Sequence, residues 1–415
     1  MRRTVPILAF AIALTACGES PTGPGDVGLQ LEARCSGGFA KQFACEGVDL
    51  WAHVPLGDLE PGLSNFASVS DVWGWTDPQT GIEYALIGRS NGLTIVDLSK
   101  PHAPKPVGRL ASPTPSSTWR DVKVYSDHAY IVADASDGHG IQILDLTRLR
   151  TLEGFTDLAV DGRYTGVSSV HNIAINEETG FAYSVGNAGG GTTCGGGLHM
   201  LDLANPTNPL FVGCFAELGT GRTGTGYTHD VQCVVYRGPD TEHQGREVCV
   251  ASNETAVVTV DVTDKSNPTT LGTGTYPDFG YIHQGWLSED HRFFYQNDES
   301  DEASGTVNRT RMLVWDVTDL DDPVLAKEHL GPTGAIDHNL YVHEGLIYHS
   351  NYTFGVRILD ASDPGNPTEL GFFDTVIEND AATFAGSWSN YPYFESGAIL
   401  VTSSREGLFV LRLPD

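Results

Sequence analysis

The chain has 415 residues, with 24 Lys and Arg against 53 Asp and Glu, which gives a formal charge of −29. So acidic a protein cannot hold nucleic acid by neutralising phosphates, and nucleic-acid partners are excluded. Gly and Pro are frequent, at 48 and 22 residues. Beyond the N-terminus no apolar run approaches the roughly 20 residues that span a bilayer. The composition therefore favours turns and few long helices, and it excludes a polytopic membrane protein.

The N-terminal residues have the pattern of a lipoprotein signal peptide. Arg2 and Arg3 precede an apolar stretch over residues 5–14, and the sequence LTACG at residues 14–18 resembles a bacterial lipobox. We expect residues 1–16 to be removed and Cys17 to be acylated; an ordinary secretory signal is the alternative. Residues 17–45 would then be the lipidated cysteine and a flexible tether. The predicted location is the bacterial cell envelope, at the outer membrane or cell surface, with the membrane as a partner through the lipid.

The cysteine count agrees with export to an oxidising compartment. Beyond Cys17, six cysteines remain in three local couples. The couples are Cys35 with Cys45, Cys194 with Cys214, and Cys233 with Cys249. We predict one disulfide within each couple, although six cysteines allow 15 pairings. Zinc binding through cysteine is the alternative, but no CxxC motif is present.

Internal repetition is the strongest signal in the chain. Seven segments end an apolar run at equivalent positions, 44 to 59 residues apart. These positions are Asp97, Asp145, Asp202, Asp261, Asp316, Asp360 and Arg412. In five copies a proline follows seven residues after the aspartate, at Pro104, Pro209, Pro268, Pro323 and Pro367. Each copy therefore indicates a strand, a turn and a second strand.

Another pair of strand-like runs lies upstream of each copy, such as HNIAIN and then FAYSVG. Four short strands per unit of about 50 residues are typical of a β-propeller blade. We therefore predict an all-β, seven-bladed β-propeller over residues 46–415. The last copy ends after three strands, so residues 48–56 are expected to supply its fourth strand. This N-terminal strand would close the ring and remove exposed strand edges.

The repeated segments resemble LVIVD repeats, and their order resembles the choice-of-anchor B family. The stretches that carry this resemblance include HNIAINEETGFAYSVG, CGGGLHMLDL and IHQGWLSEDHRFFYQNDE. The resemblance covers roughly residues 45–413 and implies an exported, surface-anchored propeller. It implies no particular biochemical activity.

Each predicted inner strand opens with a polar couplet. The couplets are Ser70-Asp71, Arg120-Asp121, His171-Asn172, His229-Asp230, His283-Gln284, His338-Asn339 and Ser389-Asn390. Inner strands line the central channel of a propeller, so the couplets are expected to form a ring near one mouth. Because the couplet recurs in blades that lack histidine, we favour a role in hydrogen bonding between blades.

Two metal sites are alternatives to be tested. Four couplet histidines, His171, His229, His283 and His338, could bind a transition metal together with Asp121 or Asp230. The acidic segment at residues 297–302 offers Asp298, Asp301 and Glu302 as oxygen ligands for calcium. That segment lacks the order of an EF-hand loop, and we favour a solvated acidic loop. No cofactor is established by the sequence.

Three functions fit these features. The leading hypothesis is a monomeric binding module that recognises a protein, glycan or small ligand at one face of the ring. The second is a metal-dependent hydrolase whose site is the histidine-lined channel mouth, and the third is a structural component of the envelope. No catalytic motif is recognisable, so an enzyme is not the preferred interpretation.

Overall fold

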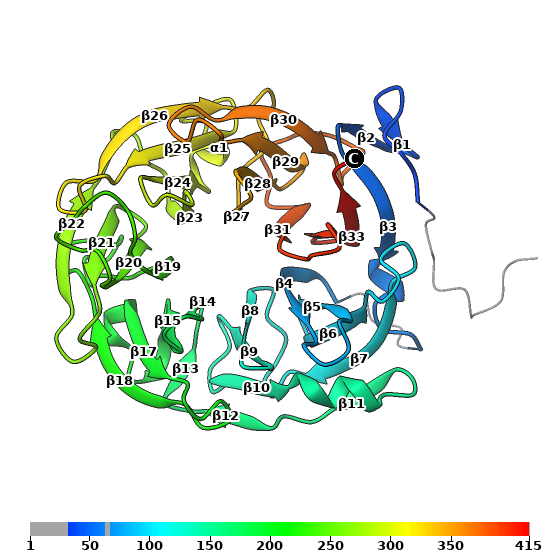
Figure 1. Ribbon diagram of the computed structural model, residues 1–415, viewed down its shortest axis with the longest axis horizontal. Helices are drawn as coiled ribbons and strands as arrows, with labels where there is room; N and C mark the ends of the chain where they lie inside the picture. The colour runs from blue at the N-terminus through cyan, green and yellow to red at the C-terminus, as the bar shows by residue number, and fades with distance from the viewer. Residues whose placement is uncertain (1–31, 63–66, 415) are drawn as a thin grey trace, which may run out of the picture.

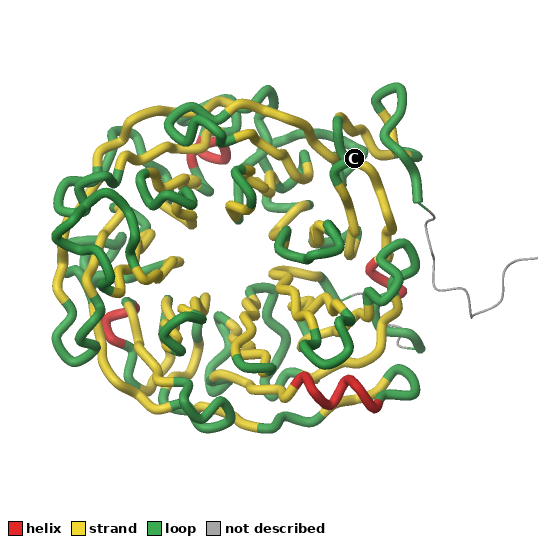
Figure 2. The backbone as a smooth tube through the Cα atoms, in the orientation of Figure 1, coloured by secondary structure: helices red, strands yellow, loops and turns green. Residues whose placement is uncertain are grey.

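Four-stranded antiparallel sheets surround a central axis in the computed structural model, which describes residues 32–62 and 67–414. Seven such blades form a β-propeller, as the repeat predicts (Figure 1). Figure 2 shows that strands make up nearly all of the regular structure. The helical segments are η1 (Leu56–Asp58), η2 (Leu146–Thr151), η3 (Cys194–Gly196) and α1 (Asp301–Ser304). Within the described ranges, no helix has the length and apolarity needed to cross a bilayer.

In each blade the strands run outward from the channel in nearly regular order. The first blade contains β4 (Val69–Thr76), β5 (Glu83–Arg89), β6 (Gly92–Asp97) and β7 (Lys105–Ala111). The second contains β8 (Arg120–Tyr125), β9 (His128–Ala133), β10 (Ile141–Asp145) and β12 (Gly162–Tyr164). The third contains β14 (Asn172–Asn176), β15 (Phe181–Val185), β17 (Leu198–Asp202) and β18 (Leu210–Phe215).

The remaining blades repeat this arrangement. The fourth contains β19 (Asp230–Val235), β20 (Glu247–Ser252), β21 (Val257–Asp261) and β22 (Thr269–Gly274). The fifth contains β23 (Ile282–Leu287), β24 (Phe293–Asp298), β25 (Arg311–Asp316) and β26 (Val324–Leu330). The sixth contains β27 (Leu340–His343), β28 (Leu346–Asn351), β29 (Gly355–Asp360) and β30 (Thr368–Phe373). The seventh contains β31 (Ser387–Tyr391), β32 (Ile399–Ser403), β33 (Gly407–Arg412) and β3 (Asp49–Pro55).

The repeated aspartate has a local structural role. In all six copies its carboxylate accepts a hydrogen bond from the backbone N–H two residues later, at 2.7–2.9 Å. This Asx turn ends the third strand of the blade. In the five copies that carry the later proline, the chain then enters the outer strand directly. The repeat is therefore a turn signal and does not mark a ligand site.

The second blade, which lacks that proline, departs from the pattern. After Asp145 the chain forms η2 and then β11 (Thr156–Leu158), which pairs in parallel with β7 of the first blade. Only then does it return as β12 to complete its own blade. A further short pair, β13 (Val167–Ser169) and β16 (Ala188–Gly191), lies beside the third blade.

The N-terminal strand closes the ring as predicted. β3 pairs antiparallel with β33, with Asp49 opposite Arg412 and Pro55 opposite Gly407. Leu50, Ala52 and Val54 of β3 are fully buried against the last blade. Burial of a side chain such as Leu or Val stabilises a fold by about 1.5–3 kcal/mol. The first and last parts of the chain are thus held together by one sheet.

The ordered structure begins before the predicted boundary at residue 46. β1 (Phe39–Ala40) and β2 (Phe43–Glu46) extend the sixth blade beyond β30, and Phe43 is buried. Three disulfides link Cys35 to Cys45, Cys194 to Cys214 and Cys233 to Cys249, with Cα atoms 5.9, 5.3 and 4.0 Å apart. These are the local couples predicted from the sequence. The first of them ties part of the predicted tether to the ring, whereas Cys17 lies outside the described residues.

Candidate functional site

The seven couplets lie where the inner strands begin. They fall within the first four residues of β4, β8, β14, β19, β23, β27 and β31 or one to two residues before the strand. Asn172, Gln284 and Asn390 each donate a hydrogen bond to a backbone carbonyl of an adjacent blade, accepted by His229, Leu340 and Tyr348. Asn339 donates to the Ser389 hydroxyl at 3.4 Å. The couplets therefore connect neighbouring blades, which is the architectural role that the sequence favours.

A buried ion-pair layer includes the couplet aspartates of the first two blades, Asp71 and Asp121, together with Lys123. The Lys123 ammonium lies 3.2 Å from Asp71 and 2.5 Å from Asp121. Asp71 also accepts from the backbone N–H of Val122, and Asp121 from that of Ile173. Each carboxylate thus bonds the backbone of the next blade. The three side chains join the first three blades.

The charges in this layer follow from burial and pairing. Burial raises the pKa of Asp71 well above its ordinary value. Burial acts in the same direction on Asp121, but the Lys123 ammonium and the hydrogen bonds from Asp71 and Ile173 together outweigh it and lower the pKa of Asp121. For Lys123, burial is outweighed by the two carboxylates, which raise its pKa well above its ordinary value. The two carboxyl groups therefore differ in acidity, with Asp71 the weaker acid and Asp121 the stronger.

On one side of this layer, the four predicted histidines form an arc across consecutive blades. Neighbouring ring centroids are 4.2 Å apart from His171 to His229, 4.2 Å from His229 to His283, and 4.4 Å from His283 to His338. Trp388 continues the arc, 4.7 Å from His338. The cavity between these rings, Trp119 and their neighbours measures only about 10 Å³. This mouth is closed to anything larger than a water molecule or an ion.

All four rings are oriented through the Nδ1 atom. Nδ1 faces the Asp134 carboxylate in His171 at 2.8 Å, and the His283 carbonyl in His229 at 2.9 Å. In His283 it faces the Asn297 side-chain oxygen at 3.0 Å, and in His338 the Trp388 carbonyl at 2.5 Å. Oxygen acceptors require Nδ1 to carry the proton, so Nε2 retains its lone pair.

Burial keeps three of these histidines neutral. It lowers the pKa of His229 and of His283 well below the ordinary value, with neighbouring imidazoles adding to the effect. Burial likewise lowers the pKa of His338 to about 3. Neutral imidazole is the form that binds metal ions.

Glu299 is a site residue that sequence reasoning did not select. It follows β24, and its two carboxylate oxygens lie 3.7 Å from His283 Nε2 and 3.5 Å from His338 Nε2. The Tyr352 hydroxyl donates to it at 2.7 Å. Burial raises the pKa of Glu299 to about 7. Glu299 lies in the segment proposed for calcium, but no spacing rule connects it to His283 of the same blade or to His338 of the next blade.

The structure narrows the predicted histidine set. Among the described residues, one buried group of ligand atoms lies within 4.8 Å of one another, and it comprises His283, Glu299 and His338. His171 and His229 belong to the arc but not to this group, so the four histidines do not converge on one point. A second group, Glu242, His243 and Asp321, lies at the surface.

The predicted solvated acidic loop is wrong, because Asp298, Asp301 and Glu302 are buried. Asp298 accepts hydrogen bonds from the Tyr276 hydroxyl and from two backbone N–H groups, each at 2.6 Å. Asp301 pairs with Arg311 at 2.7 Å, and burial raises the pKa of Glu302 to about 10. These three acids therefore serve as internal hydrogen-bonding groups. Calcium ligation there stays an untested prediction.

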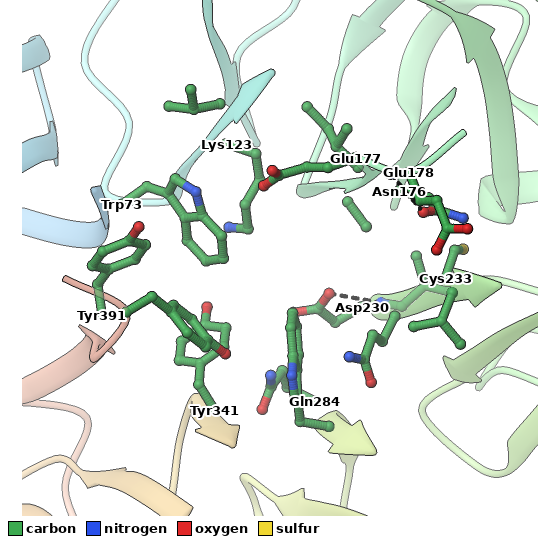
Figure 3. Close-up of a pocket in the computed structure, with 18 residues that line it drawn as sticks. Trp73, Lys123, Asn176, Glu177, Glu178, Asp230, Cys233, Gln284, Tyr341 and Tyr391 are labelled. Atoms are coloured by element: carbon green, nitrogen blue, oxygen red, sulfur yellow. Dashed lines mark hydrogen bonds between the residues drawn. The ribbon is translucent and has the colours of Figure 1, made fainter. Parts of the chain in front are cut away.

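The opposite mouth of the channel opens as a funnel of about 470 Å³. Trp73, Trp286, Tyr341, Tyr391 and Tyr393 supply its aromatic surface. Figure 3 shows Trp73, Tyr341 and Tyr391 together on one side, with Asn176, Glu178 and Cys233 on the other. The Lys123 ammonium lies 4.5 Å from the Trp73 ring centre, so it forms part of the floor. A Cβ at Gly74 would overlap the Tyr391 ring, so glycine permits this packing.

The funnel carries more acid than base. Lys123 is matched by Asp71 and Asp121, whereas Asp230, Glu177 and Glu178 also line the walls. Burial raises the pKa of Asp230 to about 7, and it raises that of Glu177. Glu178 pairs with the exposed Arg237 at 2.6 Å. The wall therefore presents carboxylates next to aromatic faces.

Two predicted couplet residues, Asp230 and Gln284, line this funnel, but sequence reasoning did not identify the funnel itself, although a signal exists. Side chains two residues apart on a strand point to the same side. Residues placed two after the second couplet position line the funnel in six blades. They are Trp73, Lys123, Ala174, Gln232, Trp286 and Tyr341. Extending the couplet alignment by two positions would have found them.

Comparisons with known proteins support the fold. Residues 83–111, which span β5 to β7, match the LVIVD repeat. The chain is therefore a β-propeller that contains an LVIVD repeat. No curated protein matches it.

Among solved structures, the fold is similar to a protein from Lactobacillus plantarum, with 14% identity and a TM-score of 0.52 over 81% of this chain and 88% of that one. It is also similar to a chain of the COPII outer coat vertex on membranes, with 14% identity and a TM-score of 0.57 over 84% and 85%. At these identities the likeness concerns the fold alone.

Proposed function

We propose that this protein is an exported, lipid-anchored propeller of the choice-of-anchor B type that binds a small organic cation in its funnel. The single observation behind the binding role is a cavity of about 470 Å³ with five aromatic side chains and three carboxylates beyond the Lys123 layer. Ligand sites are typically concave, mostly apolar and supplied with a few polar groups, and this funnel matches that description.

The chemistry of the walls favours a cation with apolar substituents. The faces of Trp and Tyr attract ammonium groups, by about 0.5–2 kcal/mol per contact. Asp230 and Glu177 add carboxyl groups without a paired Lys or Arg among the described residues, and a bound cation would favour their charged forms. Alkylammonium groups, whether free or on a lysine side chain, satisfy both features.

The histidine mouth does not favour the alternative of a hydrolase. Its cavity of about 10 Å³ has no room for a substrate beside the rings. The funnel, in contrast, has the volume but lacks a recognisable pairing of nucleophile and base. We therefore propose binding, with no hydrolytic step.

Choline is a suitable first probe, because Trp73 and Trp286 in the funnel would report binding by a change in fluorescence. Tyr341→Ala and Glu177→Gln are each expected to weaken choline binding by about 3- to 30-fold. The matched control is Tyr236→Phe, since Tyr236 is buried outside the funnel. Tighter binding of neutral oligosaccharides than of choline, at the same residues, would assign the funnel to glycans and refute the cation proposal.

The anchor is tested separately. Cys17→Ser is expected to move the protein from the membrane fraction to the soluble fraction, because two acyl chains hold a domain firmly at about 0.8 kcal/mol per buried CH₂. Fractionation and mass spectrometry of the N-terminal peptide measure this. A variant that remains in the membrane fraction would contradict the lipid anchor while leaving the funnel proposal intact.

A further inference from the structure

Three potential ligand atoms meet at the closed mouth of the channel, opposite the funnel. His283 belongs to β23, Glu299 follows β24, and His338 precedes β27. All three ligand atoms lie within 4.8 Å of one another. The shortest distances are 3.7 Å from His283 Nε2 to Glu299 Oε2 and 3.5 Å from His338 Nε2 to Glu299 Oε1. Two ligands of a tetrahedral zinc ion with bonds of 2.0–2.1 Å lie about 3.3 Å apart, so small shifts would complete the geometry.

Hydrogen bonds to each residue hold its metal-binding atom toward this point. The Nδ1 atoms of His283 and His338 donate to Asn297 and to the Trp388 carbonyl. Such bonds fix the tautomer with Nε2 unprotonated, which is the usual support around metal-binding histidines. The Tyr352 hydroxyl holds one oxygen of Glu299.

The surroundings of these atoms are buried and suit a small ion. His283 and His338 are only 2% and 3% exposed, and the ionic partner of both Nε2 atoms is the Glu299 carboxylate. Buried polar atoms are normally paired. The local cavity of about 10 Å³ admits an ion or a single water but no organic ligand.

We infer that His283, His338 and Glu299 bind one divalent transition-metal ion of the zinc type. Imidazole with one carboxylate suits Zn²⁺ better than the oxygen-seeking Ca²⁺ or Mg²⁺. The ion joins the fifth and sixth blades at the mouth, and its remaining position is filled by water. The inference is independent of the funnel and of any catalysis.

The test uses the purified full-length protein, dialysed against Zn²⁺ and then against metal-free buffer, with metal content measured by mass spectrometry. We expect about one zinc per chain. His338→Asn keeps an N–H donor near the Nδ1 position but removes Nε2, and Glu299→Gln keeps an acceptor for Tyr352 but removes the charge. Both variants are expected to lose zinc by tenfold or more. Circular dichroism checks that they remain folded.

Two matched variants identify the site. His171→Asn removes an arc histidine outside the group, and His243→Asn removes the histidine of the surface group. Both are expected to keep the metal. Cobalt supplies an independent readout, because Co²⁺ replacing Zn²⁺ should give visible absorption bands in the parent and in these two variants only.

Absence of bound zinc in the parent would overturn the inference, as would metal that survives both His338→Asn and Glu299→Gln. Metal lost on His243→Asn would assign it to the surface instead. Thermal melting adds a last criterion. Zinc should raise the Tm of the parent but not that of His338→Asn, because only a ligand of the native state stabilises it.

Discussion

The two mouths of the channel are built from the same seven strands yet differ in almost every property. At the histidine mouth, aromatic and imidazole rings contact one another and leave about 10 Å³. At the funnel, two residues further along the strands, aromatic side chains surround about 470 Å³. Lys123, Asp71 and Asp121 lie between them. Seven repeats of one blade therefore produce one closed end and one open end.

The difference shows how side-chain choice decides function on a symmetric scaffold. At the closed end, the couplet side chains of Asn172 and Asn339 bond to the next blade and hold the ring together. At the open end, the inner strands carry the aromatic and acidic side chains that line the funnel. A binding site can therefore form where the inner-strand side chains are not needed for hydrogen bonds between blades.

Both mouths require a closed ring, so we expect the largest loss of folding stability from a substitution in the closing strand, β3. Leu50→Asp puts a charge at a fully buried position of β3 and should cost about 5 kcal/mol or more, which opens both ends together. Guanidinium denaturation and size-exclusion chromatography measure the loss. Leu210→Asp is the control, since Leu210 in outer strand β18 is 59% exposed. Equal stability of the two variants would show that β3 does not close the ring.

Disrupting the ion-pair layer of Lys123, Asp71 and Asp121 should cause the next largest loss of folding stability. Lys123→Met leaves Asp71 and Asp121 buried without their cation, at a cost of about 3–5 kcal/mol at pH 7. The loss should shrink as the pH falls toward 4, because protonation neutralises the unpaired carboxylate. Urea denaturation at several pH values tests this, with the exposed Lys100→Met as control. A loss independent of pH would mean that packing, and not charge, is the main role of Lys123.

Asp230 distinguishes the funnel by its pH dependence. Its pKa is raised to about 7, so the folded protein binds more protons than the unfolded chain between about pH 4 and pH 7. The contribution of Asp230 to stability therefore falls as the pH rises through this range. Asp230→Asn lacks this effect and should gain about 2–4 kcal/mol relative to the parent from pH 4 to pH 8. Parallel pH profiles for parent and variant would contradict the raised pKa.

The substitution with the smallest expected loss of stability tests whether the two mouths of the channel are independent. His171→Asn weakens the hydrogen bond to Asp134 and should cost about 1 kcal/mol, without changing choline binding at the funnel. A double variant with Tyr341→Ala should show additive effects on stability within about 0.5 kcal/mol. Coupling above that value, or an altered affinity for choline, would mean that the two ends communicate through the ring.

Much of the architecture could be predicted from the sequence, because it rests on local signals. The aspartate before each outer strand forms an Asx turn with the backbone two residues later, so its spacing gave the number of blades. The incomplete last copy predicted that β3 pairs with β33, and cysteines 10 to 20 residues apart predicted the disulfides. The repeat also placed the four histidines on adjacent inner strands.

Only the tertiary structure decided which of these groups meet. Glu299 joins His283 and His338 because β24 and β27 belong to neighbouring blades, and no spacing in the sequence measures that distance. The acidic segment at residues 297–302 was expected to be solvated, yet packing between blades buries it. The sequence by itself determined the strands, the turns and the closure of the ring, because each depends on backbone preference and pairing between segments that the repeat identifies. The metal-binding triangle and the funnel depend on distances across the channel, which exist only once seven blades have closed around it.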